Sequence, residues 1–352
     1  MSFIPKLIII IGLAIGHLTF SNSAYTQELQ NSFYVDINQS MGFIMGQNFS
    51  LNRIKTEYPE LATRAMIVES HFKKSFGNAE KNMDNELRRI LEDQYSEYMS
   101  TVDESISGSL NSQKINHSLA LQFLDEIEMR AKGVIPSPIL ETLLIYQFAG
   151  YPQNEFLQGY KSKYLTVGHL KSKGIDLQVE YPKSWSSREG NRPNVIQFFS
   201  SNNGRGPAYA LVMTRDLLAE AQDLLTSKEK AVLKTYEGSQ ALADEIFSKN
   251  NLREMAEEVG LYNVREMKSK RIIIDRWPGA MLEFIGEQQR LDLVVTMYTR
   301  MYLAIYENYL ITLHCQLGEF NGDIDNNLKQ NISEYTPLFH LMANSLIIQN
   351  QY

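Results

Sequence analysis

Two different spacings of apolar residues divide the chain into a first and a second half. From Gln27 to about Leu165, apolar side chains recur every three or four residues, as in a helix with one buried face. After about Thr166 they alternate with polar ones, as in a strand with one buried face. This order predicts an α+β protein, with an N-terminal helical bundle followed by a layered domain with a mostly antiparallel sheet.

The first half is expected to contain several helices joined by short turns. One is predicted to start at Pro59 and another, capped by Asn78, to run on to the segment around Gly108. A third covers residues 117–131 with Gly133 as its stop, and a fourth starts at Pro138, a residue suited to a first helical turn.

The second half opens with the segment GIDLQVEYPKSW, residues 174–185. Its alternation predicts a strand that ends at Pro182, because proline cannot donate a ladder hydrogen bond. Further strands are expected at 194–199, 208–214, 271–275, 280–286, 291–306 and 309–317, the last two joined by Glu307 and Asn308. A helical insertion over 226–259, capped by Thr226 or Ser227, and a last helix over 326–346, bent near Pro337, complete the domain.

The first 24 residues have the pattern of a secretory signal peptide. Lys6 precedes an apolar run from Leu7 to Gly16, and small residues follow at Ser21, Ser23 and Ala24. An uncleaved anchor is the alternative, but the run is about half of the roughly 20 residues that a spanning helix needs. We therefore expect a soluble, extracytoplasmic protein without a transmembrane segment after cleavage, either in a bacterial periplasm or secreted.

The predicted organisation is a signal peptide at 1–24, a helical domain at 25–165, a linker at 166–173 and an α+β domain at 174–352. The chain has 352 residues and a net charge of −7, so it lacks the basic character that nucleic-acid binding needs. Cys315 is its one cysteine, which excludes an intrachain disulfide. We expect Cys315 to be a small buried hydrophobe on a strand face with Leu313 and Leu317.

Residues 174–349 resemble the PsbP-like family. The resemblance is carried by the opening strand ending in YPKSW, the FF and YALVM strands, the hairpin IIIDRWPGAMLEF, the strand pair MYTRMYLAIYENYLITLHCQ and the closing segment FHLMANSL, with landmarks at Pro182, Trp185, Gly279 and Ser345. It implies an α/β/α sandwich and a docking or assembly role, with no shared catalytic motif. The helical half falls outside the resemblance.

One predicted strand, at 291–306, presents a candidate binding surface. Tyr298, Arg300, Tyr302 and Tyr306 alternate with aliphatic residues, so one face is apolar core and the other carries tyrosines and an arginine. Tyrosine and arginine are enriched at protein interfaces. The alternative is that these tyrosines pack beneath the inserted helix with their hydroxyl groups at the rim.

The sequence supports a catalytic or metal-binding site less than it supports the binding surface at 291–306. A hydrolase or other enzyme with a site between the domains would first involve Glu283, His314 and His169, although a strand histidine such as His314 is more often a hydrogen-bonded structural residue. Residues 323–334 place oxygen ligands at calcium-loop spacing, but Leu328 stands where the loop needs glycine. We therefore expect no metal and no cofactor.

A basic stretch lies at the domain boundary. Lys161, Lys163, His169, Lys171 and Lys173 precede the first acidic residue, Asp176. Such a stretch suits either a solvated linker or contact with an anionic partner or lipid headgroup.

These features together favour an exported, non-enzymatic module that binds or helps to assemble another extracytoplasmic protein. The enzyme described above and a secreted factor acting on a host cell are the alternatives.

Overall fold

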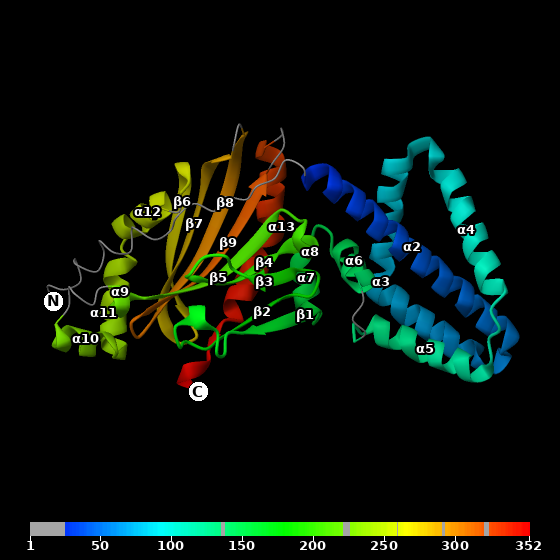
Figure 1. The fold of residues 1–352 in the computed structure, drawn as a ribbon, viewed down its shortest axis with the longest axis horizontal. Helices are drawn as coiled ribbons and strands as arrows, with labels where there is room; N and C mark the ends of the chain where they lie inside the picture. Colours follow the sequence, from blue (N-terminus) through cyan, green and yellow to red (C-terminus); the bar gives the residue numbers. More distant parts are fainter. Residues whose placement is uncertain (1–24, 135–137, 221–225, 259, 291–292, 320–323) are drawn as a thin grey trace. The chain divides into compact units, whose positions relative to one another are not determined.

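The computed structural model describes residues 25–134, 138–220, 226–258, 260–290, 293–319 and 324–352 (Figure 1). The signal peptide predicted at 1–24 lies outside these residues. Contacts divide the described chain into two compact units, residues 25–160 and 161–352. The first is helical and the second combines helices with antiparallel sheets, which confirms the α+β class with a helical N-terminal region.

The first unit, here called the helical unit, packs its helices around one apolar core. Two long helices joined by a single 3-10 turn form its frame, and shorter helices cover them. Its elements are α2 (Tyr25–Glu57), η1 (Pro59–Leu61), α3 (Ala62–Leu91), η2 (Glu92–Gln94), α4 (Tyr95–Asn111), α5 (His117–Ala131), α6 (Pro138–Gln147) and α7 (Pro152–Leu157). As predicted, α6 starts at Pro138, and Gly133 follows α5 with a φ of +67°.

Helix α3 differs from its prediction at both ends. The predicted boundary at Asn78 lies inside α3, where the chain only kinks at Phe76 (φ −133°, ψ 15°). The predicted helix through Gly108 instead stops at Leu91, because Glu92 adopts φ 47° and ψ −118°. The corner lets α4 turn back onto α2, where the Tyr98 hydroxyl group donates to Asn38 Oδ1 at 2.7 Å.

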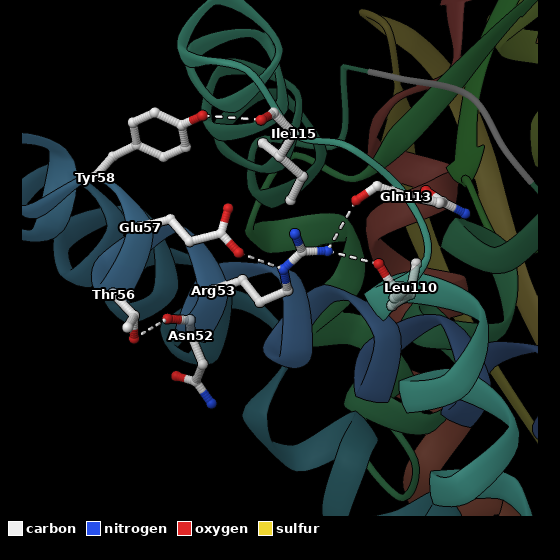
Figure 2. Close-up of polar contacts among 8 residues, drawn as sticks. All are labelled: Asn52, Arg53, Thr56, Glu57, Tyr58, Leu110, Gln113 and Ile115. Atoms are coloured by element: carbon white, nitrogen blue, oxygen red, sulfur yellow. Dashed lines mark hydrogen bonds and ion pairs between the residues drawn. The ribbon is translucent and has the colours of Figure 1, made fainter.

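Arg53 of α2 ties the connection between α4 and α5 to this frame (Figure 2). Its Nη1 donates to the carbonyl oxygens of Leu110 at 2.5 Å and Gln113 at 3.2 Å, while Nε donates to Glu57 at 2.9 Å. Nearby, the Tyr58 hydroxyl group donates to the Ile115 carbonyl oxygen at 2.9 Å. The last carbonyl groups of a helix have no partner within it, so Arg53 acts as a C-terminal cap supplied by another helix.

We expect Arg53→Met to loosen this connection. Hydrogen bonds from a charged group contribute about 2 kcal/mol, so amide exchange over residues 110–117 should become about 30-fold faster by hydrogen–deuterium exchange. Tyr58→Phe, which removes one neutral hydrogen bond, should accelerate it about fivefold. Equal amide exchange rates in wild type and Arg53→Met would show that the hydrogen bonds of Arg53 do not hold the connection between α4 and α5.

The second unit, here called the sheet unit, contains two antiparallel sheets. One has the order β1-β2-β10 and the other the order β3-β4-β5-β9-β8-β7-β6. The strands are β1 (Lys161–Leu165), β2 (Leu177–Pro182), β3 (Ser186–Glu189), β4 (Val195–Ser200), β5 (Ala208–Asp216), β6 (Tyr262–Ile274), β7 (Trp277–Arg290), β8 (Leu293–Tyr306), β9 (Tyr309–Glu319) and β10 (Ile347–Ile348). β2 ends at Pro182, as expected.

Helices cover both faces of the larger sheet. The described helices of this unit are α8 (Ser201–Gly204), α9 (Leu217–Glu220), α10 (Ser227–Leu233), α11 (Tyr236–Ile246), α12 (Lys249–Glu258) and α13 (Ile324–Asn344), with 3-10 turns η3 (Leu170–Ser172) and η4 (Gln349–Gln351). α11 and α12 pack their apolar residues onto one face of β7 and β8. α13 lies on the opposite face, where the rings of Tyr302 and His340 are 6.2 Å apart.

Two expectations about helices need correction. The insertion is not one helix but α10, α11 and α12, since Thr235 caps a second start within it. Thr226 forms the expected cap, with Glu229 completing a capping box. The last helix continues through Pro337 and already begins at Ile324.

The predicted linker, residues 166–173, belongs to the sheet unit. Lys161–Leu165 is strand β1, which pairs with β2, so residues 166–173 connect two strands of one sheet. The sequence did not predict this strand, because its exposed positions, Lys161, Lys163 and Leu165, do not show a buried apolar face. β1 is also an edge strand that pairs only with β2. The C-terminal strand β10 completes this sheet on the other side of β2.

Candidate functional site

The predicted tyrosine face of β8 is buried. Tyr298, Tyr302 and Tyr306 retain 5%, 2% and 6% of their exposure, so they cannot form the open binding surface that the sequence suggested. Tyr298 and Tyr302 pack beneath a helix, as the alternative proposed, but that helix is C-terminal α13 rather than the insertion. Tyr306 lies at one end of this face, with its ring 4.7 Å from that of Trp277.

Arg300 and Glu283 form an ion pair within this face. They are direct partners across β8 and β7, and Arg300 Nη1 lies 3.0 Å from Glu283 Oε2. Both side chains retain 14% of their exposure. Glu283 also accepts from the Tyr298 hydroxyl group at 3.1 Å, and its other oxygen lies 3.1 Å from Lys268 Nζ. Every oxygen of Glu283 is therefore paired.

Two polar atoms of the same cluster have no hydrogen-bond partner among the described residues. They are Arg300 Nε and the hydroxyl group of Tyr302. The guanidinium carbon of Arg300 lies 5.5 Å from the centre of the Tyr302 ring, so the aromatic face compensates part of the missing hydrogen bonding. A buried unpaired donor carries a desolvation cost, which makes this cluster sensitive to substitution.

Two titratable side chains on this face, Tyr302 and Cys315, are held in their neutral forms. Burial raises the pKa of Tyr302 and of Cys315, which lies directly across from Arg300 on β9. A thiol is nucleophilic as the thiolate, so Cys315 behaves as the predicted buried hydrophobe. The described geometry suits a structural polar cluster under α13.

His314 lies on the opposite face of the sheet and is buried at 2% exposure. Its Nε2 has no hydrogen-bond partner among the described residues, and burial lowers its pKa to about 4. The sequence predicted a hydrogen-bonded histidine here, and that expectation is wrong for Nε2.

Gln316, two residues further along β9, is hydrogen-bonded on the same face. It accepts from the Tyr209 hydroxyl group and donates to Thr299 Oγ1 at 2.8 Å.

The three residues of the enzyme hypothesis are not brought together. Glu283 pairs across the sheet with Arg300 and His314 with Met301, and successive residues of a strand point to opposite faces. Glu283 and His314 are therefore separated by the sheet. His169 caps η3, where its Nδ1 accepts from the Lys171 amide.

No group of three or more histidine, cysteine, aspartate or glutamate side chains among the described residues could hold a metal ion. The calcium-like segment is helical from Ile324 onward, which removes the loop that the spacing required. Among the described helices, none combines the length and apolar character of a bilayer-spanning segment.

An open apolar surface, not identified from the sequence, lies on the outer side of α3. A shallow hollow there is lined by Thr63, Met66, Ile67, Ser70 and His71. Met66 and Ile67 are 54% and 50% exposed. We call these five residues the α3 face. Met66 and Ile67 fall between the buried positions of α3, which is the sequence signal that could have revealed them.

Ion pairs and hydrogen bonds run along both sides of the α3 face. Toward α5, Arg64 pairs with Asp125, and His71 Nδ1 lies 2.8 Å from Glu128. On the other side Glu69 bonds to Lys55 at 2.5 Å and Lys73 at 2.8 Å, and these bonds lower the pKa of Glu69. The surface thus has an apolar centre and a polar rim, which is how protein interfaces are built.

The described chain therefore offers a closed polar cluster under α13 and an open apolar face on α3. No protein-family model matches the chain, and no curated protein matches its sequence.

Proposed function

We propose that this chain is an exported binding or assembly module that contacts another extracytoplasmic protein through the α3 face. The observation that carries the proposal is the pair of half-exposed side chains Met66 and Ile67 between two rows of ion pairs. Methionine is enriched at interfaces because its flexible side chain adapts to a partner surface. Export rests on the signal-peptide pattern of residues 1–24.

The form of the α3 face favours a helical or extended segment of the partner. An exposed helix surface with an apolar centre, as Met66 and Ile67 form here, can pack against the apolar face of an amphipathic helix. Thr63 and Ser70 lie beside the apolar centre, and small side chains allow close approach of a partner backbone. The flanking ion pairs keep Arg64, Glu69 and Lys73 away from the centre.

The sheet unit supports the same role through the resemblance to PsbP-like proteins. An antiparallel sheet with helices on both faces is consistent with that resemblance, whose implication is docking rather than catalysis. We propose that the sheet unit is a PsbP-like α/β/α sandwich. Its buried polar clusters then serve folding, and the contact surface lies elsewhere.

Site-specific photo-crosslinking tests the α3 face. A photoreactive residue at position 67 should give one reproducible adduct in intact cells of the source organism. Val35 of α2 is 48% exposed and provides a matched control position on another helix. The proposal fails if adducts at position 67 are no stronger or more specific than those at position 35.

Binding of the captured partner should then depend on the apolar centre. Ile67→Asp places a charge where apolar contact forms, and we expect at least a tenfold loss of affinity by titration calorimetry with purified proteins. Val35→Asp should change the affinity less than twofold. Both positions are half-exposed, so neither variant should unfold the helical unit.

A further inference from the structure

Among the described residues of the sheet unit, the most exposed aliphatic side chain belongs to Leu170, on the connection between β1 and β2. Leu165, Val167 and Leu170 are 48%, 65% and 93% exposed and lie within six residues of one another. We call residues 165–173 the β1–β2 loop. Single exposed aliphatics are common on protein surfaces, but three between the end of β1 and the middle of this loop need a physical reason.

The β1–β2 loop is held by hydrogen bonds on its inner side. The buried Thr166 donates from Oγ1 to the Ile175 carbonyl oxygen at 2.9 Å and accepts from the Leu177 amide at 2.7 Å. Thr214 Oγ1 on β5 donates to the Lys171 carbonyl oxygen at 3.0 Å. Exposure of Leu170 is therefore not the result of a loose chain: the loop is preorganised to present it.

Basic charge surrounds the exposed aliphatics. Lys163 and Lys173 are exposed and have no ion-pair partner among the described residues. Lys171 lies 2.7 Å from Glu189, so that carboxylate is neutralised. The β1–β2 loop and the strand residue Lys163 beside it thus combine exposed apolar side chains with two positive charges that form no ion pair among the described residues.

We propose that the β1–β2 loop binds the surface of an anionic lipid bilayer, with Leu170 and Val167 inserted among the headgroups. Aliphatic residues flanked by lysine are the composition of interfacial membrane binders. Three aliphatic side chains offer far less area than the about 800 Å² per partner that a standard protein interface buries. A bilayer requires neither that area nor a matching shape. This binding is independent of the α3 face.

Vesicle sedimentation tests the proposal with the chain purified from Tyr25 onward, which contains every described residue. We expect binding to vesicles of phosphatidylglycerol mixed with phosphatidylcholine, weakening as salt rises. Leu170→Ser should weaken it at least fivefold, because the inserted apolar area is lost. Combined Lys163→Gln and Lys173→Gln should weaken it about fivefold for each lysine.

A matched control separates this loop from general surface apolarity. Ile273 on β6 is 74% exposed, so Ile273→Ser removes a comparable aliphatic from the same unit. It should leave vesicle binding unchanged. The proposal is overturned if the chain does not bind the vesicles, if Leu170→Ser and Ile273→Ser behave alike, or if the lysine variant binds as well as wild type.

Discussion

Acidification from pH 7 to pH 4 should cost the sheet unit about 3 kcal/mol of stability through His314 alone. The reference pKa of histidine is 6.5, and burial lowers the pKa of His314 to about 4. Between these values the unfolded chain binds a proton that the folded chain does not bind. Stability therefore falls as the pH drops through 6.5 and continues to fall until about pH 4.

His314→Leu provides the comparison, because leucine has a similar volume and no titrating group. Urea unfolding at pH 7, 6, 5 and 4 can be followed by tryptophan fluorescence. Both tryptophans, Trp185 and Trp277, lie in the sheet unit, so the signal reports this unit without the helical one. The stability of the variant relative to wild type should rise by about 3 kcal/mol between pH 7 and pH 4.

Carboxylates also titrate in this range, and the comparison removes them. A hydrogen bond from Lys171 lowers the pKa of Glu189, and hydrogen bonds from Asn263 and Arg265 lower the pKa of Glu287. Protonation of these two carboxylates therefore adds its own loss of stability in acid. They are present in both proteins and cancel in the difference. Parallel stability curves for wild type and His314→Leu would contradict the assignment to His314.

The sequence predicted the strands that alternate strongly and missed those that do not. β8 and β9 could be predicted because apolar residues alternate with partly polar ones over many positions. Glu307, with a positive φ of 49°, lies in the turn that joins them. β1 was hidden by its exposed lysines, and β10 by its length of two residues. Short edge strands carry too little alternation to be separated from loops.

The corner between α3 and α4 shows a different limit. Apolar residues keep their helical spacing across Glu92, so periodicity predicts one continuous helix. The corner is bridged by contacts to Tyr95 of α4, whose hydroxyl group donates to Asp84 of α3 and whose ring centre lies 4.0 Å from the Arg88 guanidinium carbon. Tertiary packing of α4 onto α2 outweighs the local preference.

The candidate site was only partly predictable for the same reason. Alternation on β8 correctly separated the tyrosines from the aliphatic face, but it could not show which element covers them. α13 follows β9 in the chain and returns over β8 and β9, and the alternation along β8 gives no sign of which face this helix covers. Pairing of Arg300 with Glu283 depends on the register of β7, which a single sequence does not reveal.

Breaking the Arg300–Glu283 pair should be the most damaging substitution in the polar cluster. Arg300→Met leaves the Glu283 carboxylate without its main partner in a site of 14% exposure, and such losses cost about 3 kcal/mol. Tyr298→Phe removes one hydrogen bond to Glu283 and should cost about 1 kcal/mol. Urea unfolding with tryptophan fluorescence at pH 7 measures both.

Two further variants identify the cause of that loss. Tyr302→Phe removes a hydroxyl group that has no partner among the described residues and keeps the ring beneath Arg300, so stability should stay within about 0.5 kcal/mol of wild type. The double variant Glu283→Leu with Arg300→Met removes both charges and should recover at least half of the loss, because no buried charge is left unpaired. A double variant as unstable as the sum of its single variants would show that packing, rather than the charge pair, stabilises this face beneath α13.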